Sequence, residues 1–221
     1  MSEFSAAGPV PAKTRKLVLQ VAIGAIVGGA ASFGVLKAIE GTGFNLDDPS
    51  RVAALGIGLV FILMGTLVAF GLALPGPGER LLNVEDADEL REQRRPLVRS
   101  AASILLIGVM MIALALAGGP ESTGLISREA AAIAFAAIAV ITTLVSFGAH
   151  KDNDELMRSI AREGSAWGFY ASLAIFTTWG ALAHLGYVAW ITPLGMVSAL
   201  LAIMLAAIFI VCGVRGVLTP R

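Results

Sequence analysis

Six long apolar segments recur along this chain of 221 residues and constrain its fold more than any other feature. Each approaches the roughly 20 residues that a helix needs to cross a hydrocarbon core of about 30 Å. Since unpaired backbone groups are costly in lipid, segments of this kind cross as helices. The pattern predicts an all-α, polytopic membrane protein, one domain of residues 17–214 with three hairpins made from six transmembrane helices, approximately 17–39, 52–74, 97–117, 129–149, 165–186 and 194–214.

The composition supports the same class of protein. Hydrophobic residues make up 57% of the chain and charged residues 14%, whereas about a quarter of an ordinary soluble domain is charged. A formal net charge of zero gives no indication of nucleic acid as a partner. The lipid bilayer is therefore the expected environment, and the first segment is expected to be retained as an uncleaved anchor.

Basic residues predict the orientation in the membrane, because Lys and Arg near helix ends favour the cytoplasmic side. All of the 16 basic residues except Lys37, Arg51 and Arg128 lie on one set of connections or, for Arg99, three residues beyond one of them. These comprise the tails 1–16 and 215–221 and the charged loops 75–96 and 150–164. Both termini are thus expected in the cytoplasm, and the excess of Arg over Lys with abundant Ala and Gly suggests a bacterial cytoplasmic (inner) membrane.

An acidic pentapeptide occurs once in each charged loop, as DADEL from Asp86 and as DNDEL from Asp152. Each contains D-x-x-E, the spacing of a helix capping box. Arginines follow the acids, at the level of the lipid headgroups. We interpret both copies as helix starts whose charged residues form candidate contacts with a partner or the lipid surface: Asp86, Asp88, Glu89, Arg94, Arg95, Arg99, Asp152, Asp154, Glu155, Arg158 and Arg162.

Other interpretations of this repeated acidic sequence have less support. An EF-hand calcium loop beginning at Asp86 needs Gly at its sixth position and Glu at its twelfth, where this chain has Arg91 and Leu97. General acid–base catalysis needs a pocket that shifts a carboxyl pKa, and a charged loop offers none that is obvious. Docking of a cytoplasmic protein stays open, and the repeat itself arises either from duplication of a helix pair or from convergence.

The apolar segments carry little chemistry. No ionisable residue lies convincingly in mid-membrane, where such a residue would mark transport or catalysis. His150 and His184 fall on opposite faces under the predicted topology, and the single cysteine, Cys212, excludes an internal disulfide. We therefore predict no catalytic residue, no metal site and no cofactor.

Small residues instead predict close helix packing. Gly24, Gly28 and Ser32 share one face of the first segment, and Ala54 and Gly58 have the same spacing in the second. Such faces also suit a homo-oligomer. On the outer side, Asp48 before Pro49 is expected to cap the second helix, and Ser127 the fourth.

The run DELMRSIAREGSAWGFYASL, from Asp154 to Leu173, resembles the loop-to-helix junction of small uncharacterised bacterial multi-pass proteins. In these proteins a D-E-x-x-x-x-I pattern precedes a helix rich in alanine and aromatic residues. The resemblance covers about one tenth of the chain and implies a multi-pass membrane protein without an assigned activity.

Three functions are compatible with these features. The first is a non-enzymatic scaffold or regulatory subunit that engages a partner through its cytoplasmic loops. The second is a small transporter or channel subunit that acts as an oligomer. The third is a lipid-modifying enzyme at the inner membrane interface.

Overall fold

The computed structural model describes residues 12–40, 42, 48–74, 94–117, 124–152 and 155–217. Of these, residues 12–23, 25, 36 and 147–152 are described by their backbone alone. The described part is helical, which confirms the all-α prediction. Its helices are α1 (Ala12–Ile39), α2 (Pro49–Ala73), α5 (Arg94–Leu116), α6 (Arg128–Asp152), α7 (Glu155–His184) and α8 (Pro193–Val214).

Four of these helices are long and apolar enough to cross a membrane: α2, α5, residues 128–146 of α6, and α8. α1 contributes a shorter apolar stretch, Ile26–Ile39. α7 begins with charged residues and has hydroxyl, glycine and aromatic residues among its apolar ones. Membrane crossing by α1 and α7 therefore stays a prediction.

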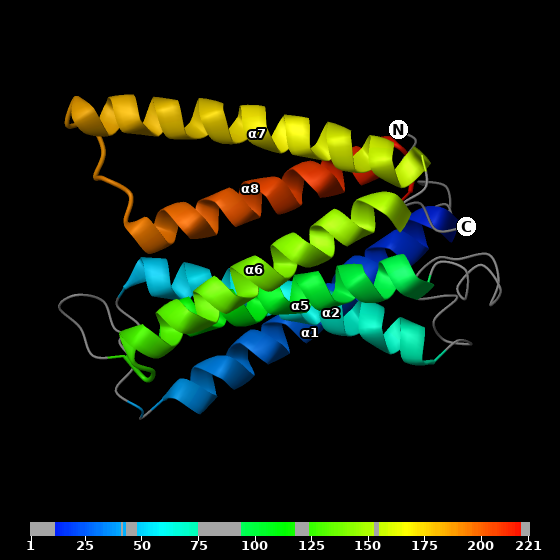
Figure 1. Ribbon diagram of the computed structural model, residues 1–221, viewed down its shortest axis with the longest axis horizontal. Helices are drawn as coiled ribbons and strands as arrows, with labels where there is room; N and C mark the ends of the chain where they lie inside the picture. The colour runs from blue at the N-terminus through cyan, green and yellow to red at the C-terminus, as the bar shows by residue number, and fades with distance from the viewer. Residues whose placement is uncertain are drawn as a thin grey trace, which may run out of the picture.

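The helices run alternately up and down along the long axis of the molecule (Figure 1). α2 packs most closely against α5, α6 lies against α5, and α8 joins α2 to α7. α1 makes only limited contact with α2. Two of the three predicted hairpins, α5 with α6 and α7 with α8, are thus closely packed pairs, whereas α2 prefers α5 to its hairpin partner α1.

Glycine residues bring the backbones of α2 and α5 together. A Cβ atom added to Gly108 would lie 2.8 Å from the carbonyl oxygen of Gly58, and one added to Gly58 would lie 3.0 Å from that of Gly108. Gly65, two turns further along α2, would meet Leu105 in the same way. Small residues let membrane helices gain dispersion contacts over their backbones. Beside this crossing, Ala54, Met111 and Ala115 are completely buried.

A second small-residue face joins α7 to α8. Gly164, Gly168 and Ser172 are buried at four-residue intervals along α7. Added Cβ atoms at the two glycines would meet Ile208 and Met204 of α8. This spacing is the small-xxx-small pattern of membrane helix pairs. The contacts of the two glycines identify the side of α7 that faces α8.

The predicted helix caps on the connections at one end of the bundle are confirmed. Asp48 accepts a hydrogen bond from the Ser50 backbone N–H at 2.9 Å, and Pro49 opens α2. Ser127 accepts one from the Ala130 N–H at 3.2 Å at the start of α6. Thr192, which we did not predict, caps α8 through the Gly195 N–H at 3.0 Å and also hydrogen-bonds Ser50.

The charged loops differ from the prediction in their helix limits. Asp152 is the last residue of α6 rather than the start of the next helix, and α7 begins at Glu155. α7 then continues without a break to His184, so that the helix starting in the charged loop 150–164 and the fifth predicted span, 165–186, form one helix. Pro96 lies in the first turn of α5, where the backbone N–H that proline lacks is not needed.

Candidate functional site

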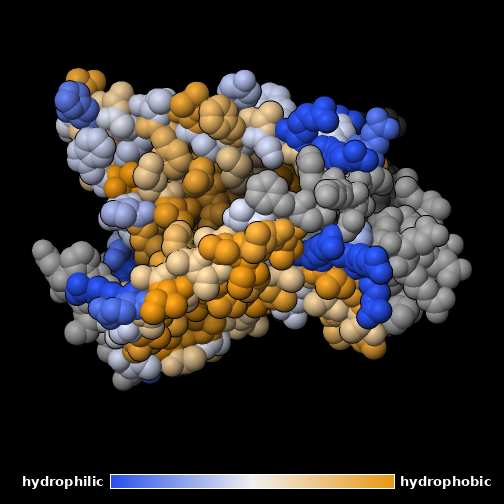
Figure 2. Space-filling view, viewed as in Figure 1, coloured by the Kyte–Doolittle hydropathy of each residue, from blue (hydrophilic) through white to orange (hydrophobic). Residues whose placement is uncertain are grey.

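Polar and charged side chains gather where α1, α5 and α7 begin and α2, α6 and α8 end. We call this region the arginine end, after its described residues Arg94, Arg95, Arg99, Arg158, Arg162 and Arg215. Lys37, Arg51 and Arg128 lie at the opposite end of the bundle. Hydrophobic residues cover most of the length between the ends, and hydrophilic patches lie over the starts of α7 and α5 (Figure 2). The sequence-predicted charge separation is therefore also a spatial one.

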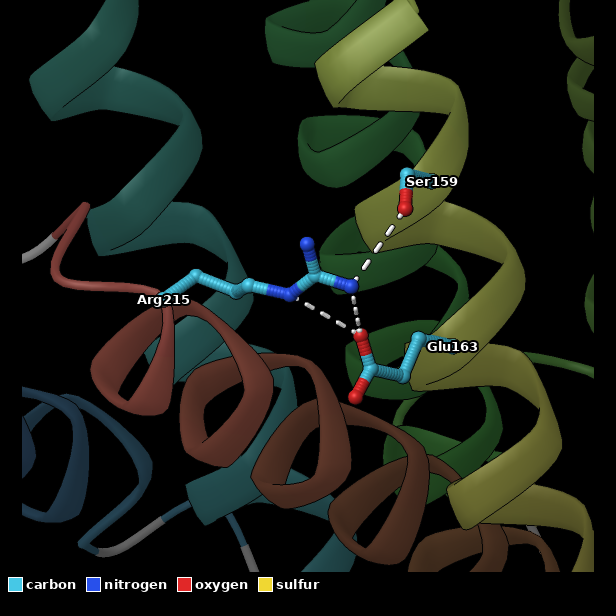
Figure 3. Close-up of polar contacts among 3 residues, drawn as sticks. All are labelled: Ser159, Glu163 and Arg215. Carbon is cyan, nitrogen blue, oxygen red and sulfur yellow. Dashed lines mark hydrogen bonds and ion pairs between the residues drawn. The ribbon is translucent and has the colours of Figure 1, made fainter.

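An ion pair joins α7 to the end of α8. The guanidinium of Arg215 donates to Glu163 Oε2 from Nη2 at 2.6 Å and from Nε at 3.1 Å (Figure 3). The same Nη2 lies 3.4 Å from the hydroxyl of Ser159, one helical turn before Glu163. Because Arg215 is the C-cap residue of α8, this contact fixes the relative position of the two helix ends.

Two groups of basic residues lie at the same end of the bundle as this ion pair, on separate helices. Arg158 and Arg162, four residues apart, are exposed on α7, and Arg94 and Arg95 are exposed at the start of α5. Arg99, one turn further along α5, is half-buried. Within the described part of the chain, Arg94, Arg95 and Arg162 form no ion pair or hydrogen bond.

Most of the acidic residues of the predicted site lie outside the part of the chain that the structure describes. Asp86, Asp88, Glu89 and Asp154 lie outside the described residues, and Asp152 is described only by its backbone. Glu155 is the first residue of α7 and is exposed. The structure thus brings Glu155, Arg158 and Arg162 onto one helix end, with the α5 arginines at the same end of the bundle.

The two small-residue faces predicted for packing have different surroundings. Ala54 is buried and Gly58 contacts α5, as described above. On α1, no atom of the described residues lies within 4 Å of a Cβ added to Gly24 or Gly28, and Ser32 is exposed. Its hydroxyl donates to the Gly28 carbonyl at 2.8 Å. The α1 face is therefore not covered by any of the described residues.

Several residues that organise the structure were not identified from the sequence. Glu163 and Arg215 are 52 residues apart, and only their positions at adjoining ends of consecutive apolar segments could have suggested a contact. The Gly164–Gly168–Ser172 face has the same spacing as the α1 face and could have been found by the same criterion.

Arg51 is the most buried charged residue described, with 4% of its surface exposed. Its Nε donates to the Ala115 carbonyl at 3.0 Å and its Nη2 to the Ala117 carbonyl at 2.6 Å. These carbonyls belong to the end of α5, where the helix leaves acceptors without intrahelical partners and carries a partial negative charge. Arg51 therefore links the start of α2 to the end of α5, a role that its place among outer-side basic residues did not indicate.

No group of three or more His, Cys, Asp and Glu side chains suited to a metal ion occurs in the described ranges. His150 belongs to the last turn of α6 at the arginine end, and His184 ends α7 at the opposite end. Trp179 donates its indole N–H to the Ala189 carbonyl at 3.1 Å, which ties α7 to the connection before α8.

Comparisons of this chain with protein-family models, with curated proteins and with solved structures found no match. The arrangement of residues at the arginine end and the packing of the helices are therefore the basis for a functional proposal.

Proposed function

We propose that this protein is a non-enzymatic scaffold or regulatory subunit of the bacterial cytoplasmic membrane. In this proposal all six described helices cross the bilayer, the arginine end faces the cytoplasm, and a partner protein binds there. The connections that carry Asp86, Asp88 and Glu89, and the exposed first turns of α7 with Glu155, form the binding surface. No cofactor and no nucleic acid is involved.

The closed contact between α2 and α5 is the observation that carries this proposal. Gly58 and Gly108 place the two backbones in direct contact, and Gly164 and Gly168 let Ile208 and Met204 of α8 pack against the backbone of α7. Helix pairs packed in this way leave no room between them for a polar pathway. Charged side chains gather instead at the arginine end, where a partner in the aqueous phase would meet them.

The dimensions of α7 support its place as a span. Its 30 residues correspond to about 45 Å at roughly 1.5 Å per residue, more than the hydrocarbon core of about 30 Å. The first three turns carry its charged residues and would project beyond the core. Trp167 and Tyr170, both exposed, lie at the start of the remaining stretch, and Tyr187 and Trp190 follow its end. Aromatic residues favour both membrane interfaces.

Site-specific photo-crosslinking in native membranes tests the proposal. A photoreactive residue at position 155 is expected to form a discrete adduct with one protein, whereas the same residue at Tyr187, exposed at the opposite end, is expected to form none. The adduct at position 155 should disappear when the partner identified by mass spectrometry is deleted. Absence of a protein adduct at both 155 and 89 would refute the proposal.

A small transporter or channel subunit that works as an oligomer is the second candidate. The α1 face favours it, because Gly24 and Gly28 have the spacing of a helix-packing face, yet no described residue lies within 4 Å of a Cβ added to either. The two candidates differ in a flux measurement. Solute or ion flux through purified protein in liposomes, abolished by Gly28→Leu, would favour the transporter over the scaffold.

A further inference from the structure

The side of α7 that faces away from α8 carries a basic and then an apolar surface along one line. Successive residues of a helix are about 100° apart, so positions separated by four, seven and eleven residues share a side. Arg158, Arg162, Phe169 and Leu173 meet this condition, and all four are exposed. Ile160, Gly164, Gly168 and Ser172 are buried, and their mean direction around the helix axis is about 130° from that of the first set. We call the first set the α7 stripe.

If α7 crosses the membrane, the charged part of the α7 stripe begins at the depth of lipid phosphates with Arg162, and Arg158 lies further into the aqueous phase. With Trp167 at the edge of the hydrocarbon core, Arg162 would lie about 8 Å and Arg158 about 14 Å further along the helix axis. The headgroup layer is roughly 5 to 8 Å thick on each side of the core. Long arginine side chains extend along the helix to reach such a layer.

The nearest described carboxylate on α7 does not neutralise Arg162. Glu163 is engaged by Arg215, whose Nε and Nη2 both donate to its Oε2. Arg162 forms no ion pair with the described residues. Glu155, one turn before Arg158, lies further from the apolar part of the helix. Among the described residues, Arg162 is therefore an unpaired cation beside a hydrophobic surface.

We propose that the α7 stripe binds an anionic phospholipid, with the phosphate on Arg158 and Arg162 and an acyl chain along Phe169 and Leu173. Phe169 exposes 57% of its surface and Leu173 51%. An acidic peptide or a soluble anion would use the arginines alone, whereas a phospholipid uses both parts of the stripe. Arg94 and Arg95 of α5 add positive charge at the same end of the bundle. This inference does not depend on a protein partner.

Lipid-dependent stability of the purified full-length protein tests the proposal. Melting in detergent is followed with added phosphatidylglycerol or phosphatidylcholine of identical acyl chains. We expect phosphatidylglycerol to stabilise the protein at lower concentration, and Arg158→Gln with Arg162→Gln to weaken its apparent affinity by roughly thirtyfold, from the contribution of each basic residue near an anionic surface. Arg128→Gln, the same change at an exposed position of the opposite end, is expected to leave the affinity unchanged.

Three further measurements separate the outcomes. Phe169→Ala is expected to reduce the affinity for phosphatidylglycerol, because the acyl chain loses its contact. Inorganic phosphate alone is expected to give no stabilisation, and Arg158→Lys with Arg162→Lys to keep most of the lipid effect. Equal stabilisation by the two lipids, full affinity in the double Gln variant, or an equal effect of inorganic phosphate would overturn the proposal.

Discussion

Gly58 of α2 and Gly108 of α5 face each other so closely that a side chain on either would contact the backbone of the other helix. This contact lies in the most extensive helix interface of the described structure, and completely buried Ala54, Met111 and Ala115 lie beside it. In a membrane, where lipid is as apolar as the side chains, dispersion contacts of this kind hold helices together. The glycine pair therefore anchors the bundle.

Substitution of Gly108 by alanine should destabilise the protein. The new methyl group would meet the Gly58 carbonyl oxygen and the Ile62 backbone nitrogen, which cannot move without separating the helices. We expect a loss of about 1 to 3 kcal/mol, typical of overpacking. Thermal unfolding in detergent measures it. Gly56→Ala is the matched control on α2, since nothing lies within 4 Å of its added Cβ and alanine favours a helix. Equal melting temperatures for the two variants would contradict the interface.

Arg51 should be far more sensitive to substitution than a basic residue beside a predicted loop would suggest, because it is buried. Arg51→Met removes the hydrogen bonds to the carbonyls of Ala115 and Ala117 and leaves these acceptors poorly satisfied. The expected cost is about 2 to 4 kcal/mol, read from the same unfolding measurement. Lys37→Met provides the comparison, because Lys37 and Glu40 form an exposed ion pair worth less than about 1 kcal/mol. If Arg51→Met lowered the free energy of unfolding no more than Lys37→Met does, the hydrogen bonds of Arg51 to the end of α5 would not contribute to stability.

The ion pair between Glu163 and Arg215 should contribute modestly to stability. Both side chains are more than a third exposed, and such pairs contribute about 0.2 to 1 kcal/mol. A double-mutant cycle with Glu163→Gln and Arg215→Gln measures the coupling between them. We expect a coupling within this range that decreases at high salt, and a charge-reversed pair, Glu163→Arg with Arg215→Glu, to recover part of it. Strictly additive single effects would show that the contact carries no energy.

The proposed orientation predicts which positions react with an impermeant thiol reagent. In a Cys212→Ser background, cysteine at Tyr187 should be labelled in intact cells, because this exposed position lies at the opposite end from the arginines. Cysteine at Glu155 should be labelled only after the membrane is opened. The reverse pattern would place the arginine end outside the cytoplasm. Labelling of both positions in intact cells would show that α7 does not cross.

Much of the secondary structure could be predicted from the sequence, because each part of it depends on neighbouring residues. The apolar segments indicated where each described helix lies, and Asp48 and Ser127 were recognisable as caps from their position before the helix. The helix start in the loop 150–164 and the span at 165–186 were predicted separately but form one continuous helix, with which charged residues at its start are compatible. Local pattern shows that a segment is helical but not that two helical segments are separate.

The sequence by itself thus determined a helical chain with apolar spans and with its basic residues on alternate connections, since hydrophobicity and charge act on each segment alone. Only the tertiary structure decided which helices are in contact. Gly24 with Gly28 and Gly164 with Gly168 have the same spacing, yet the first pair is open and the second packs against α8. The physical reason is that a small-residue face gains energy only when another helix approaches it. The same holds for Arg51 and for Glu163 with Arg215, whose partners are distant in sequence and adjacent only in the folded bundle.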